Sequence, residues 1–123
     1  MNKYRDKSDF EINKAVAVEM FGLNRVIEKG DSIYIDECDC GAMFSFDPCN
    51  NPSDAMPIII ENGISLIKED DHYIAASTDV GIEGYIGAHE LMLYGLGWLS
   101  KDKNPCRAAM EVFLMMKDVE NEK

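Results

Sequence analysis

Apolar and polar residues alternate with two different periods along the chain, and each period predicts its own kind of element. From residue 9 to 21 apolar side chains recur at helical spacing. Ser8 and Glu11 before them are typical of a capping box, and Gly22 suits the end of a helix. The pattern therefore predicts a helix over 9–21. Its buried face is expected to carry Ile12, Val16 and Met20.

Two further helices are predicted where an Asn-Pro pair precedes a run of apolar residues. Asparagine is a good N-cap, and proline fits the first helical position. The first of these helices follows Asn51 and covers 52–61, and the second follows Asn104 and covers 105–119. The second has a broad apolar stripe. Its polar positions are expected at Arg107, Glu111 and Lys117.

Alternation with period two predicts strands that pair as two antiparallel hairpins. The first hairpin joins 32–36 to 42–46, and the second joins 64–68 to 73–78. The segment 79–100 holds five of the nine glycines, and its residues 90–94 fit a strand or a helical turn equally well.

Together these elements predict one α+β domain spanning residues 1–123. We expect one small sheet of four or five strands, mainly antiparallel, covered by three helices as a sandwich. The helix at 52–61 is a crossover that could make one strand pair parallel. The polar ends, 1–7 and 120–123, are expected to fray.

Charge narrows the classes of partner. The chain of 123 residues has 12 Lys and Arg against 23 Asp and Glu, a net charge of −11, and 46% apolar residues. Its basic residues are scattered singly, which argues against direct binding of nucleic acid. Solubility is the simplest reading of the acidity. The alternatives are a mimic of nucleic acid and a surface that docks on a basic partner.

The start of the chain is polar and no apolar run is long enough to span a bilayer, so we expect a cytoplasmic protein. Its thiols should then be reduced. Cys38, Cys40, Cys49 and Cys106 lack the paired spacing of common zinc sites. We therefore expect no metal, with Cys38, Cys40 and Cys49 as the ligands if one is bound.

Catalytic patterns are weak. His89-Glu90 lacks the second histidine of a zinc peptidase helix, and the glycines between residues 81 and 87 lack the Lys-Ser/Thr ending of a phosphate loop. We expect no catalytic residue and no cofactor, and hence no enzyme.

Two groups of residues are candidates for binding. Asn51 and Asp54 lie at the start of a predicted helix. Helix capping explains why both residue types occur there, and the alternative is that they belong to an anion-binding site. Tyr85, His89 and Trp98 lie in the glycine-rich segment. Amphipathic aromatics on such a backbone are typical of a surface that contacts a partner or a second copy of the chain.

Three sequence blocks resemble one known family. Residues 8–17, 49–59 and 104–116 are similar, in order, to the motifs of the NinX-like proteins of lambdoid phages and prophages. Pro48 and Met56 depart from that pattern, where the family often has aromatics. The wider resemblance is to the phage ABA-sandwich domain, a sheet covered by helices.

The resemblance implies a small accessory phage protein in a bacterial host, and it implies no catalytic residue. The leading hypothesis is a non-enzymatic protein that binds a host or phage protein. The alternative is a small-molecule binder, such as a sponge for a nucleotide defence signal, that uses the glycine-rich segment and a helix N-terminus.

Overall fold

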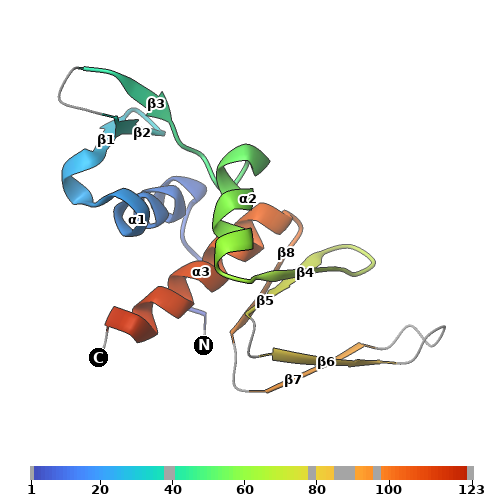
Figure 1. Cartoon of the computed structure of the whole chain (residues 1–123). Coiled ribbons are helices and arrows are strands. Elements are labelled where there is room, and N and C mark those ends of the chain that lie inside the picture. Colours follow the sequence, from blue (N-terminus) through green and yellow to red (C-terminus); the bar gives the residue numbers. More distant parts are fainter. Residues whose placement is uncertain (1, 38–40, 78–79, 85–90, 96–97, 122–123) are drawn as a thin grey trace.

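The computed structural model describes residues 2–37, 41–77, 80–84, 91–95 and 98–121. They form an α+β fold with three helices and eight strands (Figure 1). In chain order the elements are α1 (Asp9–Phe21), the short 3-10 helix η1 (Leu23–Arg25), β1 (Val26–Lys29), β2 (Ser32–Asp36), β3 (Met43–Ser45), α2 (Pro52–Glu61), β4 (Ser65–Lys68), β5 (Tyr73–Ala76), β6 (Val80–Gly84), β7 (Leu91–Gly95), β8 (Leu99–Asp102) and α3 (Pro105–Asn121).

The helices begin where the sequence predicts. The Ser8 hydroxyl accepts a hydrogen bond from the Glu11 amide at 3.2 Å, and α1 ends at Gly22, whose φ of 90° favours glycine. The prediction for α2 is also confirmed, with Pro57 inside the helix. Helix α3 runs two residues beyond the predicted end, to Asn121.

The strands form two three-stranded sheets and a two-stranded ribbon, and every pair is antiparallel. Both predicted hairpins are confirmed as β2–β3 and β4–β5. The first sheet has the order β1-β2-β3, the second has the order β4-β5-β8, and β6 pairs with β7. The described residues therefore do not show the single sheet of four or five strands, the parallel pair or the sandwich that we expected.

The reason for this difference is the path of the chain. Helix α2 follows β3 and leads to β4, which starts a new sheet instead of extending the first. Strand β8 then returns to pair with β5, so residues 99–102 complete the second sheet.

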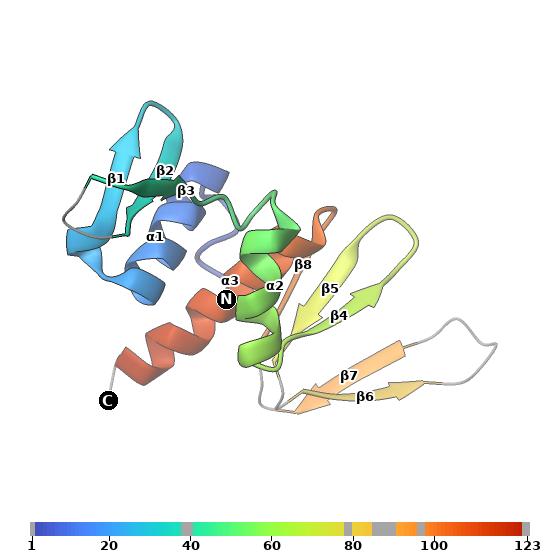
Figure 2. The same ribbon diagram turned by 45° about the horizontal axis from the view of Figure 1, so that its top comes forward.

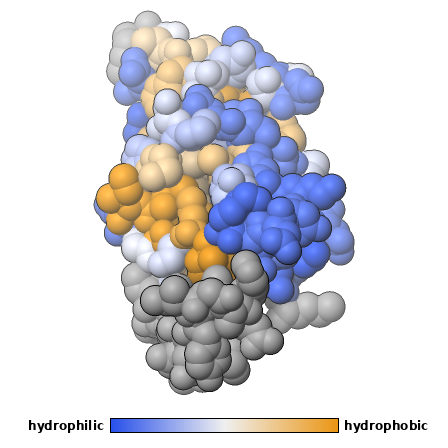
Figure 3. Space-filling model, turned by 90° about the vertical axis from the view of Figure 1, so that its right-hand side faces the viewer, coloured by the Kyte–Doolittle hydropathy of each residue, from blue (hydrophilic) through white to orange (hydrophobic). Residues whose placement is uncertain are grey.

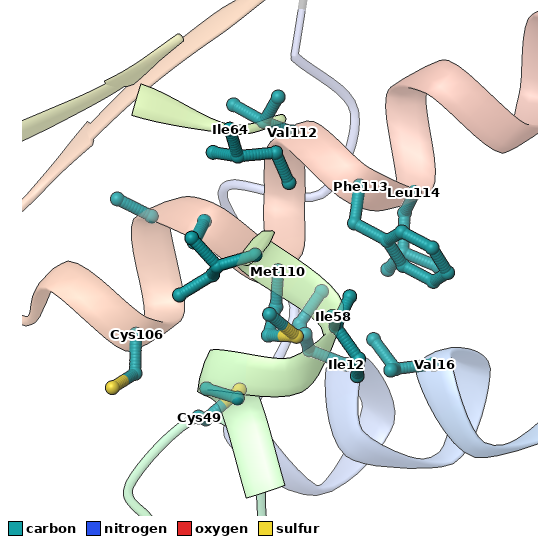
Figure 4. Packing of buried hydrophobic residues seen from close by; sticks show 14 of the residues in the cluster. Ile12, Val16, Cys49, Ile58, Ile64, Cys106, Met110, Val112, Phe113 and Leu114 are labelled. Carbon is teal, nitrogen blue, oxygen red and sulfur yellow. The ribbon is translucent and has the colours of Figure 1, made fainter. Parts of the chain in front are cut away.

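Helix α3 is the central element. It contacts α1 and α2 on one side and β5 and β8 on the other, and α1 covers β2 (Figures 1 and 2). Apolar residues from α1, α2, α3, β2 and β5 contribute to one core (Figure 4). Its most deeply buried members include Ile12, Val16, Ile35, Ile58, Met110, Val112 and Phe113.

No helix in the described ranges is long and apolar enough to cross a membrane.

The N-terminal residues pack against α3. Tyr4 is buried, and its hydroxyl donates a hydrogen bond to Asp118 on α3. Near the other end, Asn121 donates to Glu19 of α1 at 2.9 Å. Residues 2–7 and the end of α3 thus contact the rest of the fold, and the fraying expected for the ends stays a prediction.

Candidate functional site

The N-termini of α2 and α3 lie against each other. Each begins with the predicted asparagine cap: Asn51 Oδ1 accepts from the Ser53 amide at 3.0 Å, and Asn104 Oδ1 accepts from the Cys106 amide at 2.9 Å. Asn104 also donates from Nδ2 to the carbonyl oxygen of Cys49, at 2.6 Å. One side chain therefore caps α3 and ties it to the loop before α2.

Helix α1 reaches the same loop through Asn13, which is buried. Its Nδ2 donates to Asp47 Oδ1 at 2.7 Å, and its Oδ1 accepts from the Cys49 amide at 3.0 Å. Asp54 Oδ2 accepts from the Asp47 amide at 2.9 Å. The loop is thus fixed by side chains from α1, α2 and α3.

Arg107 of α3 is 7% exposed and binds α1 and the N-terminal residues. Its Nε donates to Glu111 at 2.7 Å and its Nη1 donates to Asp9 at 2.6 Å. Its Nη2 donates to the carbonyl oxygens of Tyr4 and Lys7, at 2.9 and 2.7 Å. Burial acts to lower the pKa of Arg107, but the hydrogen bonds to Glu111 and Asp9 outweigh it and raise that pKa.

Glu111 extends these contacts to the second sheet. It is 2% exposed, and its Oε1 accepts from Ser100 Oγ and from Asn2 Nδ2, each at 2.6 Å. A buried carboxylate is stable only when it is paired and hydrogen-bonded, and Glu111 meets both conditions.

We call these connected side chains the motif network. It consists of Asn2, Asp9, Asn13, Asp47, Asn50, Asp54, Ser100, Asn104, Arg107 and Glu111. Each member bonds to another part of the chain, so the network positions α1, α2, α3 and the second sheet relative to one another.

Arg107 and Glu111, which the sequence predicts as polar positions of this helix, are buried, and the sequence contains a signal for that burial. These residues are four apart, so they share a helix face, and apolar residues surround them on all sides from Cys106 to Met115. A helix that is apolar all round is buried. A charge pair inside such a helix is therefore typical of a buried ion pair.

The motif network joins all three sequence blocks that resemble NinX-like proteins. A family model described as "Bacteriophage P22, NinX" matches residues 3–117. The chain belongs to this NinX family. No curated protein and no solved structure matches the chain. NinX membership makes it a phage accessory protein. The motif network joins the three sequence blocks through hydrogen bonds within the fold.

The binding candidates from the sequence have different outcomes. Tyr85 and His89 lie outside the described residues. The structure brings Asn51 and Asp54 together at 3.2 Å, where both bond within the chain. Trp98 immediately precedes β8 and is 38% exposed, with its amide donating to Ser77 Oγ at 2.8 Å. A partner-binding role for these residues stays a prediction.

A polar hollow of about 490 Å³ lies beside the start of α2. Its lining includes Asp9, Asp31 and Asp47 as well as Asn51. Three carboxylates repel an anion, which argues against the anion site considered for this helix N-terminus.

The two described thiols are poorly suited to metal or nucleophilic chemistry. Burial raises the pKa of Cys49, and Asp9 adds to the effect. Burial also raises the pKa of Cys106. Both are therefore protonated at neutral pH, whereas metal ligation and nucleophilic attack need the thiolate. Cys38 and Cys40 lie outside the described residues.

An apolar groove of about 180 Å³ runs between the end of α1, β3 and α2. The Phe21 ring meets Phe44 and Phe46 edge to face, at 5.9 and 5.3 Å between centroids. Met20 lines the groove and is 37% exposed, which corrects its expected burial. Pro57 lines the α2 side of the groove.

Exposed apolar side chains continue from this groove along α2. Met56 next to Pro57 is 40% exposed, and Ile60 one turn later is 72% exposed. Viewed from the side, apolar side chains gather in one area of the surface, next to a strongly hydrophilic area (Figure 3). Exposed apolar residues that cluster in this way are typical of an interaction surface.

The segment that builds most of this surface is acidic throughout. Residues 30–67 contain seven Asp and Glu and no Lys, Arg or His. Arg25 stacks over the Phe21 ring at 5.3 Å, at the α1 side of the groove. The α2 side therefore offers apolar side chains and negative charge together.

The double role of Asn104 leads to a prediction. Asn51→Ala removes a helix cap and should lower the unfolding free energy by about 1 kcal/mol. Asn104→Ala removes a cap and also leaves the Cys49 carbonyl oxygen without its donor, so we expect a loss of about 2 kcal/mol or more. Urea denaturation of the two variants measures the difference, and equal losses would contradict the link between the two helix starts.

Proposed function

We propose that this phage protein is a non-enzymatic accessory protein of the host cytoplasm that binds a host or phage protein through α2 and the apolar groove. The observation that carries the proposal is the groove with Met56 and Ile60 beside it, on a segment without a basic residue. Methionine side chains adapt to partners of different shape, which suits such a surface.

Charge complementarity defines the partner. A surface with apolar side chains in an acidic setting fits a protein segment whose apolar anchors are flanked by Lys or Arg. Helix α2 itself contributes Asp54 and Glu61. The polar groups of the motif network support a non-enzymatic role, because intramolecular hydrogen bonds already occupy them.

Photo-crosslinking in phage-infected cells tests this proposal. A photo-reactive phenylalanine analogue replaces Ile60 in one variant and Leu23 in the control; Leu23 is 68% exposed and lies on η1. We expect position 60 to give a discrete crosslinked protein and position 23 to give none. Raising the salt concentration should weaken the product, because screening reduces attraction between exposed charges.

Two outcomes would contradict the proposal. One is the absence of a crosslinked product from position 60. The other is a product of twice the monomer mass in the purified protein, which would assign the surface to a second copy of the chain. As a further check, Ile60→Glu should weaken binding of the identified partner by about 10-fold or more, because it places a charge within an apolar contact.

A further inference from the structure

A second hollow lies where the β4–β5 turn meets the end of β8, and three basic residues line it. It measures about 590 Å³ and is lined by Arg5, the β4–β5 turn, the end of β8 and the residue after it. We call it the cationic hollow. Its lining residues are Arg5, Asp71, His72, Lys101, Asp102 and Lys103.

Three of the chain's twelve Lys and Arg residues converge here, although the net charge is −11. Among the described residues, neither Arg5 nor Lys101 nor Lys103 forms an ion pair. Exposed charges act over about 8 Å at physiological salt, so the three cations act together inside the hollow, where Asp71 and Asp102 offset part of their charge.

The two carboxylates of the cationic hollow already have partners. Asp102 Oδ2 accepts from the Asn104 amide at 2.8 Å. Asp71 Oδ1 lies 2.7 Å from His72 Nδ1, and this contact lowers the pKa of Asp71. Both carboxylates keep their negative charge, so the lining carries three cationic groups, on Arg5, Lys101 and Lys103, against two anionic groups.

His72 supplies a further group. Its Nε2 atom is buried and has no hydrogen-bond partner within the described part of the chain. The His72 side chain also lines the hollow, and its Nδ1 atom lies 2.7 Å from Asp71 Oδ1.

We propose that the cationic hollow binds a soluble small molecule that carries a phosphate or diphosphate group. Arg5 and the two lysines supply charge-assisted donors, and phosphate oxygens accept several such bonds at once. A volume of about 590 Å³ is within the range of small-molecule pockets. This inference concerns a different surface from the proposed protein contact and does not depend on it.

Isothermal titration calorimetry with three probes tests the site. We expect saturable binding of pyrophosphate and of ADP to the full chain, and no binding of adenosine, which lacks the phosphate. In Lys101→Gln/Lys103→Gln both affinities should fall by at least about 10-fold, because two charge-assisted bonds are lost. The control Lys14→Gln/Lys29→Gln removes the same charge elsewhere and should bind like the unchanged protein.

Other results would overturn the proposal. Absence of binding by pyrophosphate and ADP, equal binding of adenosine, or equal weakening in the two double variants would each do so. The proposal would also be overturned if the protein cosedimented with phosphatidic acid vesicles but did not bind pyrophosphate. The ligand would then be a lipid headgroup and not a soluble molecule. Lys29, Lys101 and Lys103 are exposed and Lys14 is half-buried, and thermal melting verifies that both double variants are folded.

Discussion

Arg107→Ala should lower the unfolding free energy by about 3–5 kcal/mol, because it leaves the buried carboxylate of Glu111 without its cation. It also removes the donors for Asp9 and for the carbonyl oxygens of Tyr4 and Lys7. Urea denaturation at neutral pH measures the loss. A value this large is a considerable part of the stability of a small domain.

Two other variants make this result interpretable. Arg107→Lys keeps the charge but cannot reproduce the fork of donors, so we expect a smaller loss than for alanine. Lys117→Ala breaks an exposed pair with Glu120 and should change stability by less than about 1 kcal/mol. If Arg107→Ala cost no more than Lys117→Ala, the motif network would not be what joins the helices.

Tyr4→Ala should cost about 3 kcal/mol, since it removes a buried aromatic ring from the contact between the N-terminal residues and α3. Tyr4→Phe keeps the ring and removes only the hydrogen bond to Asp118, so we expect a loss of about 1 kcal/mol. Similar losses in both variants would contradict a packing role for the ring.

The environment of Tyr4 also predicts that the stability of the fold depends on pH. Burial, and then the hydrogen bond with Asp118, raise the pKa of the Tyr4 hydroxyl in the folded protein. An unfolded tyrosine loses its proton near pH 10, whereas folded Tyr4 keeps it, so stability falls as pH rises above about 10. Tyr4→Phe should lack this part of the alkaline loss, which thermal melts from pH 9 to 11 can measure.

Local signals in the sequence were sufficient for elements with their own caps or turns. Ser8, Asn51 and Asn104 each bond the backbone as their residue types predict, and the predicted ranges of α1 and α2 agree with the structure. Strand β1 was missed because its four residues show no alternation of buried and exposed positions. Strands β6 and β8 were missed because their segment is rich in glycine.

Long-range contacts explain most of the remaining differences. Residues 2–7 are polar on average, but Tyr4 and two backbone carbonyl groups meet α3 about a hundred positions later. No local pattern reports such a contact. No local pattern reports the exposure of Met20 either. Its helical spacing places it on the apolar face of α1, but it lies at the end of the helix, where it lines the groove and is partly exposed.

The binding surfaces were the part least accessible from sequence. The cationic hollow combines residues 5, 71–72 and 101–103, which become neighbours only through the pairing of β5 with β8 and the packing of the N-terminal residues. The apolar groove combines α1, β3 and α2 in the same way. Both depend on tertiary structure, in contrast to the caps, which need only a few adjacent residues.

The central place of α3 has a consequence for synthesis of the protein. Ribosomes make α3 after every other helix and strand described here, yet α1, α2 and the second sheet all pack against it. Until it emerges, their apolar faces lack their main cover, so the core must assemble late, through contacts distant in sequence. A chain released before residue 105 would therefore expose apolar surface and become a substrate for chaperones and proteases.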